Sequence, residues 1–99
     1  MENTISGIAT LANAVQDVAA LPSVGRIVHY VLAEQDGTRN TGEHRAAMVV
    51  RTWGGDCVQL QVFMDGTNDR ASGEPLMWVT SVAYDGKTKM GRTWHWPER

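Results

Sequence analysis

The alternating pattern of residues 58–64 constrains the fold more than any other feature of this chain. Gln59 and Gln61 separate its apolar residues, which are Val58, Leu60, Val62 and Met64. Successive side chains of a β-strand point to opposite faces, so the pattern predicts a strand with one buried and one solvated face. Gly54-Gly55-Asp56 stands directly before it and favours a tight hairpin turn from a strand over Ala46–Trp53. We therefore expect an antiparallel sheet.

Three further segments have strand-like composition. We predict strands over Arg26–Leu32 and Leu76–Ala83, and a short fifth strand over Trp94–Trp96. Polar, glycine-containing stretches over residues 34–43 and 65–75 are expected to be loops. Five short antiparallel strands in one small domain must curl to close their edges. The expected fold is mainly β: a small, strongly bent five-stranded antiparallel barrel of the Src-homology or Tudor-like kind.

The first twenty residues have a helical rather than an alternating period. Apolar residues recur at helical spacing, as Ile5, Ile8, Leu11, Val15 and Val18. Asn3 and Thr4 can cap such a helix, and Pro22 stops it. We expect residues 1–21 to form an N-terminal α-helix that serves as an oligomerisation element, and residues 22–99 to form the barrel domain. The apolar stripe predicts a homo-oligomer, because large exposed apolar patches mark interfaces.

Length and composition limit the classes of partner and compartment. Ninety-nine residues support one domain, and the formal net charge of −2 argues against binding duplex nucleic acid. Cys57 is the only cysteine, which excludes an intrachain disulfide and is typical of a reducing cytosol. Polar residues interrupt every apolar run before it reaches membrane-spanning length, so we expect no membrane partner.

No familiar catalytic or metal-binding motif is present. His29, His44 and His95 have no motif spacing, so we interpret them as unrelated histidines and expect no metal and no cofactor. The serines and Cys57 lack the context of an activated nucleophile, which predicts that the protein is not an enzyme. The stretch from Asp65 to Asp69 lacks the rest of a calcium-loop pattern and is interpreted as a solvated turn.

Arginines and aromatic residues form the one set that suggests ligand binding. Arg51 and Trp53 share a strand face, a pairing suited to gripping a planar anion by charge and stacking. Residues 86–99 hold four basic residues against one acidic residue, which favours a compact anion. The predicted ligand-binding residues are Arg51, Trp53, Arg92, Tyr30, Arg45, Trp94 and His95. In the alternative interpretation, the arginines are solvated and the tryptophans plug the ends of the barrel.

Four blocks of sequence resemble a known family. They are Pro22 to Tyr30, Arg45 to Val50, Val58 to Gly66, and Gly91 to Glu98. In this order they are similar to a widespread family of small tailed-bacteriophage proteins of hypothetical function, over residues 21–99. The resemblance implies a phage gene product made in the cytoplasm of a bacterial host, and it implies no activity and no functional residues. The predicted helix over residues 3–20 departs from the family pattern.

Together these features predict a non-enzymatic binding protein. We expect a homo-oligomer that binds and sequesters a small anionic, nucleotide-like host molecule, specifically a nucleotide-derived signal of antiviral immunity. The alternative is a structural or assembly protein of the phage virion.

Overall fold

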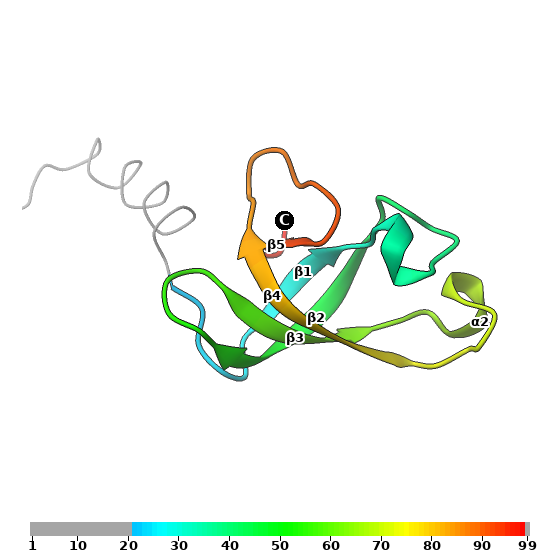
Figure 1. Cartoon of the computed structure of the whole chain (residues 1–99), viewed down its shortest axis with the longest axis horizontal. Coiled ribbons are helices and arrows are strands. Elements are labelled where there is room, and N and C mark those ends of the chain that lie inside the picture. The colour runs from blue at the N-terminus through cyan, green and yellow to red at the C-terminus, as the bar shows by residue number, and fades with distance from the viewer. Residues whose placement is uncertain (1–20, 99) are drawn as a thin grey trace, which may run out of the picture.

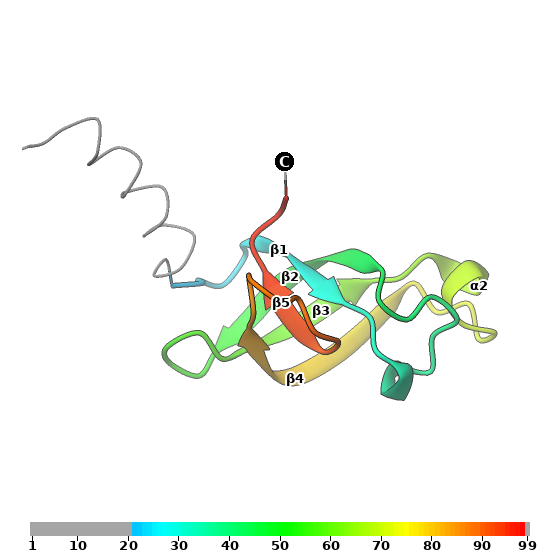
Figure 2. The same ribbon diagram turned by 90° about the horizontal axis from the view of Figure 1, so that it is seen from above.

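A computed structural model describes residues 21–98, which form a closed five-stranded β-barrel (Figures 1 and 2). The strands are β1 (Ile27–Val31), β2 (His44–Thr52), β3 (Val58–Phe63), β4 (Leu76–Tyr84) and β5 (Thr93–His95). Each strand pairs with the next, and β5 closes the barrel against β1. The predicted mainly-β, five-stranded barrel is therefore confirmed. The helix predicted over residues 3–20 lies outside the described residues.

The orientation of one strand pair corrects the expectation of a wholly antiparallel barrel. Strand β5 runs antiparallel to β1 but parallel to β4. The chain does not turn tightly after β4; it makes the wide loop drawn in orange in Figure 1 and enters β5 in the same direction as β4. The Asp85 carboxylate accepts hydrogen bonds from the backbone N–H groups of Thr88 and Met90, at 2.9 and 3.2 Å, which fixes this loop.

A bulge in β4 allows the barrel to close. Val79 and Val82 both point into the core, although residues three apart face opposite sides of a regular strand. The extra residue shifts the pairing with β3 between Val58 and Leu60, and Ser81 adopts a φ of 57°. Bulges bend and twist a strand, as a barrel this small requires.

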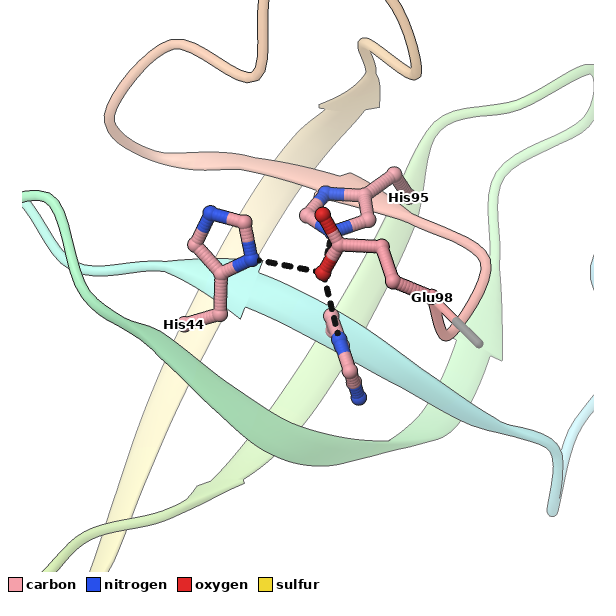
Figure 3. Close-up of side chains that lie close together, drawn as sticks. His44, His95 and Glu98 are labelled. Atoms are coloured by element: carbon pink, nitrogen blue, oxygen red, sulfur yellow. Dashed lines mark hydrogen bonds and ion pairs between the residues drawn. The ribbon is translucent and has the colours of Figure 1, made fainter.

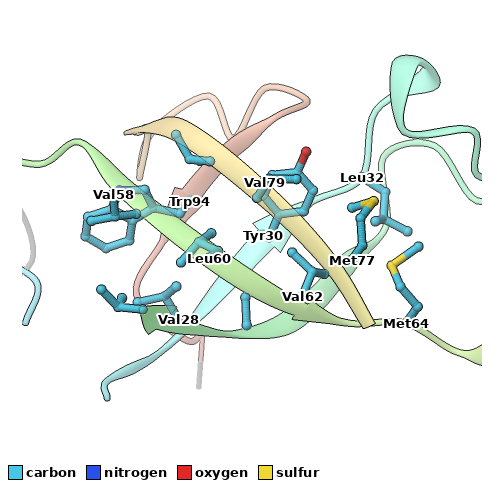
Figure 4. Packing of buried hydrophobic residues seen from close by; sticks show 13 residues of the cluster. Val28, Tyr30, Leu32, Val58, Leu60, Val62, Met64, Met77, Val79 and Trp94 are labelled. Atoms are coloured by element: carbon cyan, nitrogen blue, oxygen red, sulfur yellow. The ribbon is translucent and has the colours of Figure 1, made fainter. Parts of the chain in front are cut away.

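The core fills the interior of the barrel and contains residues from all five strands (Figure 4). It contains Val28, Tyr30, Leu32, Ala47, Val49, Val58, Leu60, Val62, Met64, Met77, Val79, Val82 and Trp94. The Trp94 side chain is fully buried, and its indole N–H donates to the carbonyl oxygen of Asp56 at 2.7 Å. Trp96 packs partly buried against it, with the ring centroids 5.2 Å apart. These two tryptophans therefore lie on the same side of the chain, which is turned toward the core.

Two short helices lie in the loops, and each carries a buried carboxylate. They are the 3-10 helix η1 (Glu34–Asp36) and the single turn α2 (Gly66–Asp69). The prediction of a solvated turn over residues 65–69 is wrong for Asp69, whose side chain is fully buried. The ion pair with Arg45 stabilises the buried position of Asp69, because a buried carboxylate is stable only when it is paired and hydrogen-bonded.

Among residues 21–98, no helix has the length and apolar character needed to cross a lipid bilayer.

Candidate functional site

Three strands bring three histidines together on the outer surface of the barrel. His29 on β1 lies directly opposite His95 on β5, and His44 on β2 lies opposite Val31, two residues along β1 from His29. Side chains directly or diagonally opposite on one face of a sheet are neighbours. Tyr30 beside His29 and Trp94 beside His95 fill the core, so these two histidines point outward. Ala47, three residues after His44 on β2, also belongs to the core, so His44 points outward too.

Glu98 completes a cluster with these histidines. The three imidazole centroids lie 4.7 to 6.2 Å apart. Glu98 follows β5, and its Oε1 atom lies 2.9 Å from His44 Nδ1, 3.3 Å from His29 Nδ1 and 3.2 Å from His95 Nε2. Figure 3 shows the Glu98 carboxylate beside the rings of His44 and His95. We call His29, His44, His95 and Glu98 the histidine cluster.

A lysine binds the other oxygen of the same carboxylate. Lys89 Nζ, from the loop between β4 and β5, lies 3.2 Å from Glu98 Oε2. The close contacts of the carboxylate with His44 and His95, followed by that with Lys89, hold the pKa of Glu98 well below its usual range. The carboxylate is therefore ionised across the physiological pH range, although its side chain is 43% exposed.

His95 is the buried member of the cluster. Its side chain is 2% exposed, and neither ring nitrogen makes a hydrogen bond to any of residues 21–98. Nε2 is near the Glu98 carboxylate but is not aligned for a hydrogen bond. Burial lowers the pKa of His95, and the nearby His44 and His29 lower it further against the opposing effect of Glu98. The ring is thus kept neutral, with a lone pair on one nitrogen.

The spacing of the four donor atoms suits a transition-metal ion. All four lie within 4.8 Å of one another. Ligand atoms about 2.0 Å from a tetrahedral ion lie about 3.3 Å apart, close to the three nitrogen–oxygen distances of the cluster. Neutral imidazole nitrogens and a carboxylate oxygen are typical ligands of Zn²⁺ and related ions.

Two of the predicted ligand-binding arginines are held in internal ion pairs. Arg45 Nε and Nη2 donate to the two oxygens of Asp69, at 2.8 and 2.7 Å, and this pairing raises the pKa of Arg45. Arg92 Nη1 lies 3.0 Å from Asp36 Oδ1. Tyr30, also predicted to bind ligand, is fully buried, and its hydroxyl donates to Asp36 at 2.9 Å.

The other four predicted residues lie in three different places. The Arg51 guanidinium stacks over the Trp53 ring, 4.4 Å from its centroid, and Trp53 is 52% exposed. Trp94 belongs to the core, and His95 belongs to the histidine cluster. The structure brings Arg51 and Trp53 together as expected, but it does not assemble the seven residues into one pocket.

Sequence reasoning did not single out Glu98 and Lys89. It interpreted His29, His44 and His95 as unrelated histidines, and their contact in the structure corrects that interpretation. One signal was available: His29 and His95 each alternate with apolar residues, which predicts that each points outward from its strand. Recognising their contact requires the pairing of β1 with β5, which stand at opposite ends of the barrel domain in the sequence.

The chain matches no protein-family model, no curated protein sequence and no solved structure. The resemblance to small tailed-phage proteins and to Src-homology or Tudor-like barrels therefore stays a prediction.

Proposed function

We propose that this protein binds a divalent transition-metal ion, with Zn²⁺ as the first candidate, through His29, His44, His95 and Glu98. The observation that carries the proposal is the convergence of three imidazole nitrogens, within 2.9 to 3.3 Å, on a single carboxylate oxygen. One of these nitrogens belongs to a buried ring that has no hydrogen bond to the described part of the chain.

Hydrogen bonding alone explains this convergence poorly. A carboxylate oxygen has two lone pairs, so the hydrogen bonds with His29 and His44 leave none for His95, whose Nε2 has no hydrogen bond to residues 21–98. Protonating all three rings would also place several cations around one carboxylate that already pairs with Lys89. A metal ion resolves both problems, because neutral imidazoles then donate lone pairs to the ion beside Glu98.

The donor set indicates which ions are suitable. Three imidazoles and one carboxylate suit Zn²⁺, Ni²⁺, Co²⁺ or Cu²⁺, whereas Ca²⁺ and Mg²⁺ prefer sites made of oxygen ligands. In solution the ion would link β1, β2 and β5 to the segment that follows β5. Binding would therefore stabilise the fold as well as occupy the site.

Metal analysis of tag-free protein tests the proposal. Calorimetry with Zn²⁺ should give one ion per chain, and His29→Ala or His44→Ala should weaken binding by about tenfold or more. Glu74→Gln is a control outside the cluster and should bind Zn²⁺ normally, because Glu74 is exposed and pairs only with Arg70 among residues 21–98. Cys57→Ser should also bind normally. Stoichiometric binding that survives both histidine substitutions would overturn the proposal.

We also propose, as a second candidate, the sequestration of a small nucleotide-like anion. The exposed Arg51–Trp53 pair favours it, because a stacked guanidinium and indole suit phosphate and base together. Calorimetry against cyclic dinucleotides, cyclic trinucleotides and cyclic ADP-ribose isomers tests this, with Arg51→Ala expected to weaken binding. A phage origin in the host cytoplasm is part of this candidate. Peptides of the protein in purified virions, without any binding heat, would favour the structural or assembly role instead.

Self-association is the third part of the proposal. Ile27, Met48 and Trp78 are exposed and lie in one row across the sheet, with Gln61 between the last two. An apolar row on an outer face supports a homo-oligomer. Light scattering of the full chain should give a mass above 10.9 kDa, and a monomer at tens of micromolar would contradict it.

A further inference from the structure

The four members of the histidine cluster differ in how rigidly the backbone holds them. His29, His44 and His95 stand on strands whose backbone hydrogen bonds fix them in the barrel wall. Glu98 lies beyond the end of β5 and is the most exposed of the four. A ligand held by packed strands is preorganised, whereas one on a short irregular segment moves at little cost.

Trp96 marks the point at which this segment is anchored. Its ring packs against Trp94, and the Arg26 guanidinium lies over it, 4.6 Å from the centroid. Among the described residues, only Pro97 and Glu98 need to move for Glu98 to leave the cluster. Strand pairing and core contacts are kept in that movement, because β5 ends at His95.

The position that Glu98 fills has the features of a site for an oxyanion. One carboxylate oxygen faces the three histidines, and the other lies 3.2 Å from Lys89 Nζ. If Glu98 moved away, a bound divalent ion and the Lys89 ammonium would both face this position without a counter-charge. An anion with two oxygens spaced as in a carboxylate would match both groups.

We propose that Glu98 is a displaceable ligand, and that the position it occupies is the binding site of a small external oxyanion of the carboxylate or phosphate class. This inference rests on the proposed metal binding. One oxygen of the anion coordinates the metal that the three histidines hold, and a second oxygen accepts a hydrogen bond from Lys89. The two oxygens of the anion thus take the places of the two Glu98 carboxylate oxygens.

Cobalt spectroscopy of the full chain tests the inference. Co²⁺ replaces Zn²⁺ in nitrogen and oxygen sites, and its visible absorption changes when a ligand is exchanged. Acetate, phosphate and chloride are titrated separately into Co²⁺-loaded wild type and Glu98→Ala. Removing the internal competitor should tighten acetate or phosphate binding by about tenfold or more, because the tethered carboxylate competes at a high effective concentration. The anion that binds more tightly identifies the class.

Lys89 supplies the second arm of the test. In the Glu98→Ala background, Lys89→Met should weaken oxyanion binding by about three- to tenfold, the scale of one charge-assisted hydrogen bond near the surface. Lys87→Met is the matched control, since Lys87 is exposed in the same loop and makes no ion pair with residues 21–98. Chloride offers a single atom, so its binding should not depend on the hydrogen-bonding arm of Lys89.

The possible failures have different meanings. If wild type binds no Co²⁺ or Zn²⁺, the proposed function falls, and the displaceable ligand falls with it. If wild type binds Co²⁺ but Glu98→Ala does not, Glu98 is indispensable and only the displaceable ligand is overturned. The inference that Glu98 is displaceable is likewise overturned if Glu98→Ala binds Co²⁺ and its visible absorption does not change with any of the three anions at about 100 mM.

Discussion

The buried Asp69 and the histidine cluster are both polar sites on one small barrel, but they differ in how fully their hydrogen bonds are satisfied. Asp69 accepts from Arg45 through two nitrogens, from the Asn40 amide at 2.7 Å and from the backbone N–H of Asp65 at 2.7 Å. The histidine cluster has three ring nitrogens within 3.3 Å of one oxygen, and the buried ring among them makes no hydrogen bond to residues 21–98. A satisfied network is typical of a structural element, whereas a buried ring nitrogen without a protein partner leaves a position for an ion, a ligand or an ordered water.

Their connections to the rest of the fold differ in the same way. Asp69 and Asn40 join α2 to the loop before β2, and Arg39 reinforces the contact by donating to the carbonyl oxygen of Thr67 at 2.7 Å. The histidine cluster joins strands that are already paired by their backbones. Loss of the Asp69 network should therefore damage the fold, and loss of the cluster should damage binding.

The largest expected effect is that of Asp69→Ala. Removing one partner of a buried ion pair leaves Arg45 uncompensated and typically destabilises by about 3–5 kcal/mol. Urea unfolding of the metal-free protein measures the loss. Glu43→Gln serves as the control, because it removes the exposed partner of the same arginine and should cost less than about 1 kcal/mol. Equal losses in the two variants would contradict the structural role of the buried pair of Arg45 and Asp69.

The next largest effect is the stabilisation by Zn²⁺. At a free concentration of about a hundred times Kd, a ligand that binds only the folded state stabilises it by about 2.7 kcal/mol. Thermal unfolding with and without Zn²⁺ should show this increment in wild type and in Glu43→Gln. In His44→Ala it should shrink sharply, and an undiminished increment there would place the metal elsewhere.

The two sites should also respond to acid in different pH windows. The Arg45 pairing lowers the pKa of Asp69, so its stabilisation is present above the unfolded pKa of about 4 and is lost as pH falls below it. Burial lowers the pKa of His95, so the ring does not affect stability above the unfolded pKa of about 6.5 and destabilises the folded state as pH falls below it. As pH is lowered from about 8 to about 5, metal affinity should thus decline, and the metal-free fold should begin to unfold only at about pH 4. Loss of both together would show that the sites are coupled.

The smallest expected effect is that of Arg51→Ala on stability. Its contact with Trp53 is exposed, and cation–π pairs at such sites contribute about 0.5–1 kcal/mol. Chemical unfolding should shift by no more than this amount, and Zn²⁺ binding should be unchanged. A larger loss would mean that the hairpin between β2 and β3 depends on the stacked pair.

The sequence predicts the local parts of this molecule well and the long-range parts poorly. Alternation locates β3 at residues 58–63 because burial of one face leaves a period of two in the sequence itself. The parallel entry of β5 is not visible in this way, since strand direction depends on the path of the loop over residues 85–92. Asp69 has no local apolar signal either, and its burial depends on an arginine 24 residues away.

The candidate site is the clearest case of long-range information. Each histidine alone is an ordinary outward-facing strand residue, and neither its neighbours nor its spacing resembles a metal motif. The contact between His29 and His95 exists only because the barrel closes, which is a property of the whole domain. The contact between Arg51 and Trp53 could be predicted, because the two residues are close in the sequence and share a strand face.

Strand β5 is three residues long, and two of these residues have different roles. Trp94 faces inward and fills the end of the core, while the next residue, His95, faces outward into the cluster. A substitution that repacks Trp94 must displace the backbone that carries His95. If the cluster binds a metal ion as proposed, substitutions at this strand that change the packing of Trp94 should change metal affinity as well as stability.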